Sequence, residues 1–251
     1  MARITLQRDG LTLVGDREEP FGEIYDMAII FHGFGGSRNA RLLKDIANKL
    51  RDENVASVRF DFNGHGESDG KFRNATVLNE IADANTILEY VKTDPHVRNI
   101  YLIGHSQGGV IASMLAGLYP DLIKKVVLLA PAANLKDEAL KGNFFGTIYN
   151  PKKIPDELRY AHQAIDGFYL RIAQNLPIYE WSSQFTGPVC LIHGKNDSVV
   201  DPQISQKYAT SFQNAQLHLL AGADHSFTDE DKMQEAVQIA TTFVKPNEFQ
   251  F

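Results

Sequence analysis

Residues 99–117 read NIYLIGHSQGGVIASMLAG and combine a strand, a tight turn and a helix. NIYLI is an apolar run typical of a buried strand, and VIASMLAG has the composition of a helix. Between them, residues 104–108 form the pattern G-x-S-x-G. Side chains at Gly104 and Gly108 would collide with neighbouring backbone, so the glycines permit a sharp turn with a strained serine. We therefore predict that Ser106 is a nucleophile projecting above the sheet.

Around this segment, short apolar runs alternate with longer amphipathic segments. Runs that are apolar on both faces are what buried parallel strands require. We expect strands at MAIIF (27–31), VASVRF (55–60), NIYLIG (99–104), KVVLLA (125–130), PVCLIHG (188–194) and LHLL (217–220), and helices over 42–50, 77–91 and 228–240. Asp9-Gly10, between RITLQR and LTLVGD, predicts an additional hairpin. The whole pattern predicts an α/β fold, a mostly parallel central sheet with helices on both faces.

Residues 132–181 interrupt this alternation, and three prolines break the helices there. The segment holds 8 of the 25 aromatic residues, and its six Lys/Arg balance six Asp/Glu. The net charge of −6 therefore belongs to the rest of the chain. We predict an α/β core of residues 1–131 and 182–251 and an insertion of residues 132–181 over the edge of the sheet.

A serine nucleophile needs a base and an acid, and where it follows a parallel strand in this way the chain order is serine, acid, histidine. His225 fits best of the eight histidines, because it lies in GADHSF between the last short strand and the last helix. Asp197 follows PVCLIHG and completes the order. Asp201 is the rival acid, although the proline after it favours the start of a turn. Asp224 adjoins His225 in sequence, which is poor geometry for accepting its Nδ1 proton.

The oxyanion that forms on attack needs two N–H donors. The N–H after the nucleophile, that of Gln107, lies at a predicted helix N-terminus. The loop after MAIIF reads HGFGGS (32–37) and places Phe34 where the second donor is expected. A dinucleotide-binding loop is the competing interpretation, but its third glycine would fall at position 38, which is Arg38.

Other polar residues have structural interpretations. Four histidines beside strand ends, each next to a glycine, are expected to hydrogen-bond loops: His32, His65, His105 and His193. Asp61, Glu67 and Asp69 in FDFNGHGESDG fit a structural turn better than a metal-binding loop, because the EF-hand spacing is absent. HExxH spacing is also absent, so we expect no metal. Cys190 is the sole cysteine, and its apolar neighbours suggest a buried structural thiol.

The 251-residue chain is acidic, with 25 Lys+Arg against 31 Asp+Glu. This balance argues against nucleic-acid binding. The longest strongly apolar stretch, residues 126–133, is far shorter than the ~20 residues that span a bilayer. MARITLQRDG lacks the apolar centre of a secretory signal. We expect a cytoplasmic protein that binds neither nucleic acid nor membrane.

These motifs carry a family resemblance. The chain resembles the serine α/β-hydrolases, and most closely the cinnamoyl (feruloyl) esterases of lactobacilli. The resemblance extends over nearly the whole chain, through FGEIYDMAIIFHGF, VRFDFNGHGESDGKF, VLNEI, KTDPHVRNIYLIGHSQGG, LYPDLIKKVVLLAPAA, GFYLRIAQ, PVCLIHG and GADHSF. Many relatives outside this subgroup have arginine where this chain has Asn63. The resemblance implies an α/β-hydrolase fold with an inserted lid, a catalytic triad and two oxyanion donors: Ser106, Asp197 and His225, then Phe34 and Gln107.

The resemblance also implies hydrolysis of hydroxycinnamate esters (feruloyl, p-coumaroyl or caffeoyl/chlorogenate type) through an acyl-enzyme, without a cofactor. Glu138 and Tyr169 would bind ring hydroxyls, and Phe144 and Phe145 would pack against the ring. Tyr169 fits a packed lid residue equally well, and Glu138 fits a solvated charge. The alternatives are a short-chain carboxylesterase or monoacylglycerol lipase and, more remotely, a non-catalytic hydrolase-like binding protein. We expect a small aromatic ester as the partner, and a monomer or homodimer.

Overall fold

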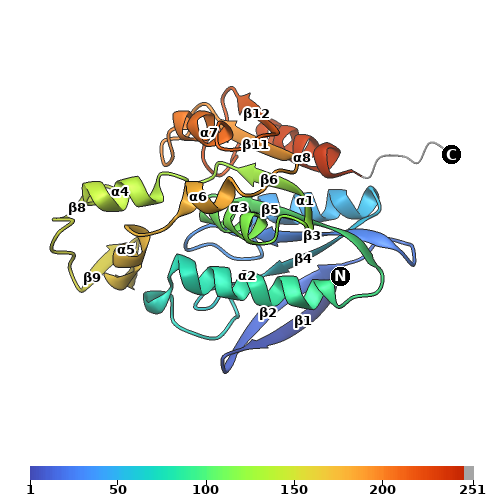
Figure 1. Cartoon of the computed structure of the whole chain (residues 1–251), viewed down its shortest axis with the longest axis horizontal. Helices are drawn as coiled ribbons and strands as arrows, with labels where there is room; N and C mark the ends of the chain where they lie inside the picture. Colours follow the sequence, from blue (N-terminus) through green and yellow to red (C-terminus); the bar gives the residue numbers. More distant parts are fainter. Residues whose placement is uncertain (246–251) are drawn as a thin grey trace.

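The computed structural model describes residues 1–245 (Figure 1). Eight strands form one sheet in the order β1-β2-β4-β3-β5-β6-β11-β12. β1 runs antiparallel to β2, and β2 antiparallel to β4. All other neighbours in the sheet are parallel, which confirms the mostly parallel α/β architecture.

The elements of the body lie where the apolar pattern predicts them. The strands of the sheet are β1 (Ala2–Arg8), β2 (Leu11–Glu18), β3 (Tyr25–Phe31), β4 (Val55–Phe60), β5 (Val97–His105), β6 (Ile123–Leu129), β11 (Val189–Gly194) and β12 (Ala215–Leu220). The helices are α1 (Arg41–Asp52), α2 (Val77–Lys92), α3 (Gln107–Leu118), α7 (Pro202–Ala209) and α8 (Glu230–Val244), with a short 3-10 turn η1 (Phe72–Asn74). The six apolar runs are therefore the central and C-terminal strands of the sheet.

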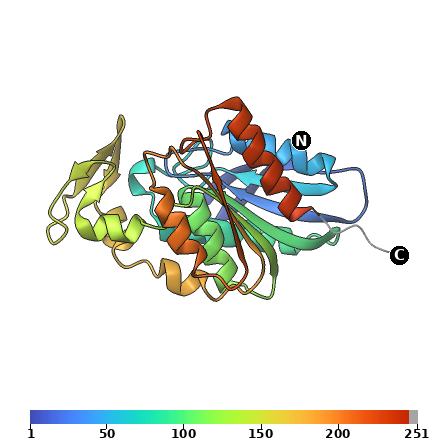
Figure 2. The same cartoon turned by 90° about the horizontal axis from the view of Figure 1, so that it is seen from above.

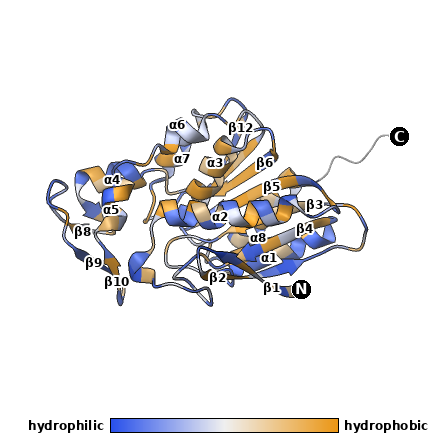
Figure 3. Ribbon diagram, turned by 60° about the horizontal axis from the view of Figure 1, so that its bottom comes forward, coloured by the Kyte–Doolittle hydropathy of each residue, from blue (hydrophilic) through white to orange (hydrophobic). Residues whose placement is uncertain are grey.

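Helices cover both faces of this sheet (Figure 2). α1 and α8 contribute to the apolar core on one face, and α2, α3 and α7 to the core on the other. α1 buries one stripe at helical spacing and leaves its other side in solvent. α3 is buried around its whole circumference, and Figure 3 shows it as apolar as the strands that it covers. Ser106, the predicted nucleophile, therefore lies at the start of the most deeply buried helix.

The N-terminal hairpin forms at the predicted dipeptide. Asp9 and Gly10 connect the paired residues Arg8 and Leu11, and both adopt positive φ, 49° and 80°. Positive φ at both central residues matches the right-handed twist of the strands, which explains the preference for Asp-Gly in such turns.

The inserted segment stands beyond one end of the sheet (Figure 2). Its elements are α4 (Leu135–Lys141), β7 (Asn143–Phe144), β8 (Thr147–Ile148), β9 (Glu157–Tyr160), β10 (Gln163–Asp166), α5 (Phe168–Ala173) and α6 (Ile178–Ser182). The sequence did not predict the two small antiparallel hairpins, β7–β8 and β9–β10. α6 packs tightly on α3, since a β-carbon on Gly117 would lie 1.8 Å from the carbonyl oxygen of Trp181. The segment is thereby fixed to the body at its C-terminal end.

The thiol of Cys190 lies in the interior of the molecule. Cys190 is fully buried in β11, and burial raises the pKa of its thiol to about 12. This is the inert structural thiol that its apolar neighbours predict. Within residues 1–245, every helix is too short or too polar to cross a membrane.

Candidate active site

Ser106 lies at the turn between β5 and α3, as the G-x-S-x-G pattern predicts. Its φ of 55° and ψ of −121° are strained for a residue with a side chain. A β-carbon on Gly104 would lie 2.1 Å from the carbonyl oxygen of Gly108, and one on Gly108 would lie 2.5 Å from those of Phe31 and His32. The close approach of backbone segments therefore explains the glycine at both positions.

Ser106, His225 and Asp197 meet at the carboxyl ends of the parallel strands. His225 Nε2 lies 3.0 Å from Ser106 Oγ, and His225 Nδ1 lies 2.7 Å from Asp197 Oδ2. When Nδ1–H donates to the carboxylate, Nε2 is left free to accept the serine proton. His105 Nε2 donates to the carbonyl oxygen of His225 at 2.8 Å and so fixes the loop that carries the base. The arrangement can perform general-base catalysis with serine as nucleophile.

Asp197 accepts four hydrogen bonds. Oδ1 accepts the backbone N–H groups of Val199 and Val200, each at 2.8 Å, and Oδ2 accepts from His225 and, at 2.9 Å, from His193 Nε2. Burial by itself would raise the pKa of Asp197, but the hydrogen bonds from His193, His225 and the Val200 N–H outweigh it and hold the pKa well below its usual range. Asp197 is therefore ionised at any physiological pH.

His193 hydrogen-bonds the loop after β11, as expected, through Asp197 and the carbonyl of Val200. The sequence analysis did not predict that its partner in this loop is Asp197. The signal was a histidine inside an otherwise apolar buried run, because a buried imidazole needs hydrogen-bond partners. Asp201, the rival acid, and Asp224 have other partners and do not contact His225 through their side chains. Asp201 caps α7 by accepting the N–H of Gln203, and Asp224 accepts from the N–H and hydroxyl of Thr228.

The loop after β3 lies against the nucleophile, since a β-carbon on Gly33 would be 2.9 Å from Ser106 Cβ. Two histidines hold this loop. His32 Nδ1 donates to the Gly33 carbonyl at 2.8 Å, and His65 Nε2 accepts the N–H of Gly35 at 3.3 Å. Burial lowers the pKa of His32 to about 3 and also lowers that of His65, so both rings are neutral at physiological pH. The expected loop-binding roles of both histidines are confirmed.

The two predicted oxyanion donors line the same cavity as Ser106. Gln107 is the first residue of α3, where a backbone N–H has no acceptor within the helix. Phe34 follows Gly33 in the loop that lies against Ser106. The backbone N–H groups of Gln107 and Phe34 are therefore placed where donors to a developing anion are needed, and their role as oxyanion donors stays a prediction.

The side chain of Gln107 connects the nucleophile turn to the lid. Its Nε2 donates to Glu80 Oε2 in α2, and its Oε1 accepts the hydroxyl of Tyr169 in α5, both at 2.5 Å. Burial raises the pKa of Glu80 to about 8, more than the Gln107 hydrogen bond lowers it, so Glu80 is protonated at neutral pH. Tyr169 reaches the cavity, as the resemblance implies, but its hydroxyl is engaged by Gln107.

A cavity of about 870 Å³ opens beside Ser106, and all four lid residues that the resemblance implies line it. The ring of Phe34 lies at the centre of an aromatic cluster, with ring centroids 5.0–6.0 Å from those of Phe72, Phe144, Phe145, Tyr160 and Tyr169. Phe144 is buried, whereas Phe145 is half exposed. The sequence analysis considered Phe34 for its N–H alone. Phe72 and Tyr160 pack against its ring without lining the cavity.

Glu138 also lines the cavity, but its carboxylate has partners within the lid. Lys141 Nζ lies 3.0 Å from Oε1, and Asn143 Nδ2 donates to Oε2 at 2.6 Å. Partial burial raises the pKa of Glu138, and the hydrogen bonds from Lys141 and Asn143 lower it further than burial raises it. Glu138 is therefore an ionised hydrogen-bond acceptor at the cavity wall.

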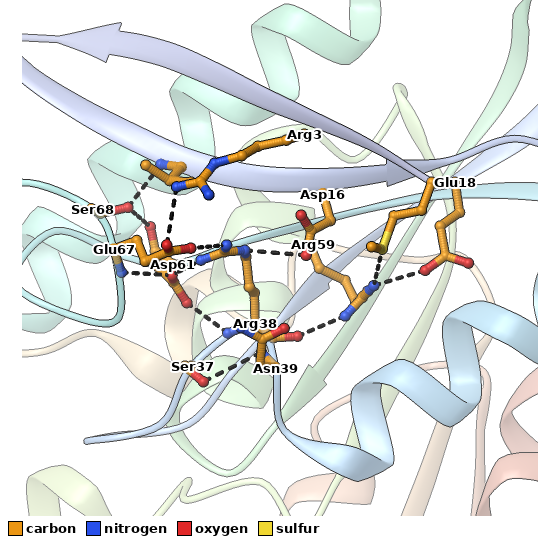
Figure 4. Close-up of polar contacts among 12 residues, drawn as sticks. Arg3, Asp16, Glu18, Ser37, Arg38, Asn39, Arg59, Asp61, Glu67 and Ser68 are labelled. Carbon is orange, nitrogen blue, oxygen red and sulfur yellow. Dashed lines mark hydrogen bonds and ion pairs between the residues drawn. The ribbon is translucent and has the colours of Figure 1, made fainter.

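The acidic loop after β4 is engaged in structural contacts (Figure 4). Asp61 accepts the backbone N–H of Arg38 at 2.7 Å and pairs with its guanidinium, which also contacts Glu67 and Asp16. Asp69 accepts a backbone N–H of β2 at 2.8 Å. These contacts join the acidic loop to the segment between the Gly33 loop and α1, as a structural turn requires.

Comparison with known proteins agrees with this geometry. Residues 23–162, more than half of the chain, match the family model described as serine aminopeptidase, S33. The chain belongs to this α/β-hydrolase family. Est1E from Butyrivibrio proteoclasticus, in a solved structure with ferulic acid bound, is 30% identical with a TM-score of 0.93, over 96% of this chain and 97% of that one.

Curated relatives of this S33-family protein match over shorter regions. Protein phosphatase methylesterase 1 from Candida albicans is 31% identical over 105 residues, which are 41% of this chain and 28% of that protein. Putative esterase/lipase 2 from Mycoplasma genitalium is 24% identical over 147 residues, 59% of this chain and 53% of that protein. The chain thus spans about half or less of the length of these relatives.

Proposed function

We propose that this S33-family protein is a serine esterase that hydrolyses hydroxycinnamate esters of the feruloyl, p-coumaroyl and caffeoyl (chlorogenate) type. The observation that carries the proposal is the aromatic wall of the cavity beside Ser106, formed by Phe34, Phe144, Phe145 and Tyr169. A flat phenolic acyl group can pack against such rings in stacked or edge-on contact. The likeness to Est1E, whose solved structure holds ferulic acid, supports the same class of ligand.

The geometry suits acyl transfer in two halves. Ser106 Oγ bonds to the ester carbonyl carbon while His225 Nε2 takes its proton, and the carbonyl electron pair moves to an oxygen bound by the N–H groups of Phe34 and Gln107. Asp197 stabilises the imidazolium. The tetrahedral intermediate then collapses, the bond to the alcohol oxygen breaks, and His225 protonates the leaving alcohol. In the second half, His225 takes a proton from water as the water oxygen bonds to the acyl carbon. The bond from that carbon to Ser106 Oγ then breaks, His225 returns the proton to Oγ, and the hydroxycinnamic acid is released.

A substrate panel tests the proposal. Purified protein is assayed with methyl ferulate, methyl p-coumarate, chlorogenic acid, p-nitrophenyl butyrate and monoolein, with Ser106→Ala as the blank. We expect the highest kcat/KM on the hydroxycinnamates and no activity above background in the blank. Much faster turnover of the aliphatic esters would assign the protein to the short-chain carboxylesterases or monoacylglycerol lipases instead. Absence of Ser106 labelling by a fluorophosphonate would favour a non-catalytic binding protein.

The aromatic wall gives a second prediction. Phe145→Ala removes a ring that stacks on Phe34, with centroids 5.5 Å apart, and leaves the backbone strain at φ 47° unchanged. Loss of an aromatic contact with its buried area is worth ~1.4 kcal/mol, so we expect KM for methyl ferulate to rise about tenfold. KM for p-nitrophenyl butyrate should change less than about twofold.

Ile148→Ala is the matched control for this variant. Ile148 lies in β8 of the same hairpin, is 77% exposed and does not line the cavity. Equal effects of the two substitutions, or equal effects of Phe145→Ala on both esters, would contradict an aromatic acyl site at this wall.

A further inference from the structure

His193 is a buried histidine that directly contacts the carboxylate of Asp197. It lies near the end of β11, has 0% exposure and approaches two acceptors with one nitrogen. Nε2 is 2.9 Å from Asp197 Oδ2 and 3.0 Å from the carbonyl oxygen of Val200. On the other side of the ring, Nδ1 is 2.6 Å from the hydroxyl of Ser205, which is fully buried in α7.

These neighbours determine where the His193 proton lies. A carboxylate and a carbonyl are acceptors, so Nε2 must carry a hydrogen to bond either of them. In the neutral ring Nδ1 is then an acceptor, and the Ser205 hydroxyl donates to it. Every polar atom of the ring is satisfied in this one tautomer. The two acceptors, Asp197 Oδ2 and the Val200 carbonyl, therefore keep the donor hydrogen on Nε2, and the Ser205 hydroxyl satisfies the nitrogen that is left unprotonated.

The contact completes the fixation of the acid. The backbone N–H groups of Val199 and Val200 hold Oδ1 in place. The carboxylate can then still pivot around Oδ1, and such a movement would displace Oδ2. Oδ2, the oxygen that meets His225 Nδ1, is the atom to which His193 donates. Removing His193 would leave Oδ2 with a single partner, the base that it has to orient.

We infer that His193 is a positioning residue of this site: its Nε2–H holds Asp197 Oδ2 in line with His225, and Ser205 holds the opposite side of the ring through Nδ1. The inference deepens the proposed esterase function and rests on it. The resulting chain of hydrogen bonds runs from Ser205 through His193, Asp197 and His225 to Ser106. Misplacing a catalytic group by about 1 Å can lower a rate about 10²-fold, which sets the scale of the expected effect.

The test compares His193→Phe, which keeps a ring but has no donor, with His193→Gln, whose amide can still donate to Asp197. We expect His193→Phe to lower kcat between about 10- and 100-fold with KM unchanged within about twofold. His193→Gln should recover most of the lost kcat. Leu191→Val, on the same face of β11 and outside the site, controls for disturbance of the strand and should keep the wild-type kcat.

A second readout separates this inference from the choice of substrate. The rate of Ser106 labelling by a fluorophosphonate reports its activation by His225 whatever ester the protein prefers, and it should fall in parallel with kcat in His193→Phe. Ser205→Ala tests the same arrangement if His193→Phe fails to fold, and we expect it to lower both rates several-fold.

The possible failures are distinguishable. Wild-type kcat and labelling rate in a folded His193→Phe variant, or equal losses in the Phe and Gln variants, would overturn the positioning role. If the wild-type protein hydrolyses no ester of the panel while its labelling rate still depends on His193, the proposed substrate fails and the positioning role stands.

Discussion

Asp197→Asn is expected to fold and to lose about 10⁴-fold in kcat against every ester that the wild-type protein hydrolyses. The reason is the complete use of both carboxylate oxygens as acceptors. Oδ1 faces two backbone N–H groups, and Oδ2 faces the ring N–H groups of His225 and His193. Wherever the amide NH₂ of asparagine points, it meets two donors.

The two orientations of the amide harm the site in different ways. With NH₂ toward the rings, His225 can bond it only by presenting an unprotonated Nδ1, which moves the hydrogen to Nε2, the nitrogen that has to accept the Ser106 proton. With NH₂ toward the backbone, the N–H groups of Val199 and Val200 lose their acceptor, at a cost of about 1–3 kcal/mol for each buried donor. The first orientation costs less in stability and abolishes the general base.

Single-turnover and steady-state kinetics with the best ester of the panel measure this effect, and thermal unfolding shows whether the variant folds. Asp201→Asn and Asp224→Asn are matched controls, because these side chains cap α7 and bond Thr228 without contacting His225. Each control should stay within about threefold of wild type. A loss below tenfold in Asp197→Asn, or a 10⁴-fold loss in Asp201→Asn, would show that another residue is the acid.

The nucleophile turn could be predicted from sequence because its constraints are local. The left-handed Ser106 and the close approaches at Gly104 and Gly108 involve residues within a few positions of one another or an adjacent strand end. The places of Asp197 and His225 also followed, since the carboxyl ends of parallel strands share one edge of the sheet. Strand order and chain order together bring these three residues into contact.

The rest of the site depends on contacts between distant segments, which leave little trace in a single sequence. β7 and β8 have two residues each, too few for a strand periodicity. Glu80 lies on a helix among apolar residues, and its partner Gln107 is 27 positions away. A carboxyl group at a core position of α2 departs from the apolar stripe of that helix. The structure explains it, because the Glu80 side chain accepts the hydrogen bond that holds the Gln107 amide.

Glu80→Gln is expected to stabilise the protein at pH 8 and not at pH 5. Glu80 Oε1 is buried and has no hydrogen-bond donor within the described residues, and His65 Nε2 lies 3.9 Å from it. Asp83, one turn along α2, adds a further acidic group, and no lysine or arginine among residues 1–245 pairs with Glu80. An ionised Glu80 would therefore be a buried charge that the Gln107 amide stabilises in part and that no lysine or arginine among the described residues neutralises.

Burial raises the pKa of Glu80 from 4.5, its ordinary value, to about 8 in the folded protein. Between them the unfolded chain releases the proton and the folded protein keeps it, so the free energy of unfolding falls as pH rises from about 4.5 to about 8. Below about pH 4.5 Glu80 is protonated in both states and does not lower the free energy of unfolding. Above about pH 8 it is ionised in both states, and the loss of stability no longer changes with pH. Glutamine resembles the protonated carboxyl and does not titrate, so the variant escapes the loss.

Thermal unfolding across pH 4–9 measures the difference in Tm between Glu80→Gln and wild type. At pH 8 we expect an increase of several degrees, since about 1 kcal/mol corresponds to ~2–4 °C in a chain of this length. At pH 5 the variant should be no more stable than wild type, because the amide buries an extra N–H. Glu89→Gln, on the half-exposed side of the same helix, controls for the replacement of a carboxylate by an amide in α2. A difference for Glu80→Gln that does not vary with pH would mean that Glu80 ionises in the folded protein as it does in the unfolded chain, and the Gln107 side chain would then bridge Tyr169 to a carboxylate.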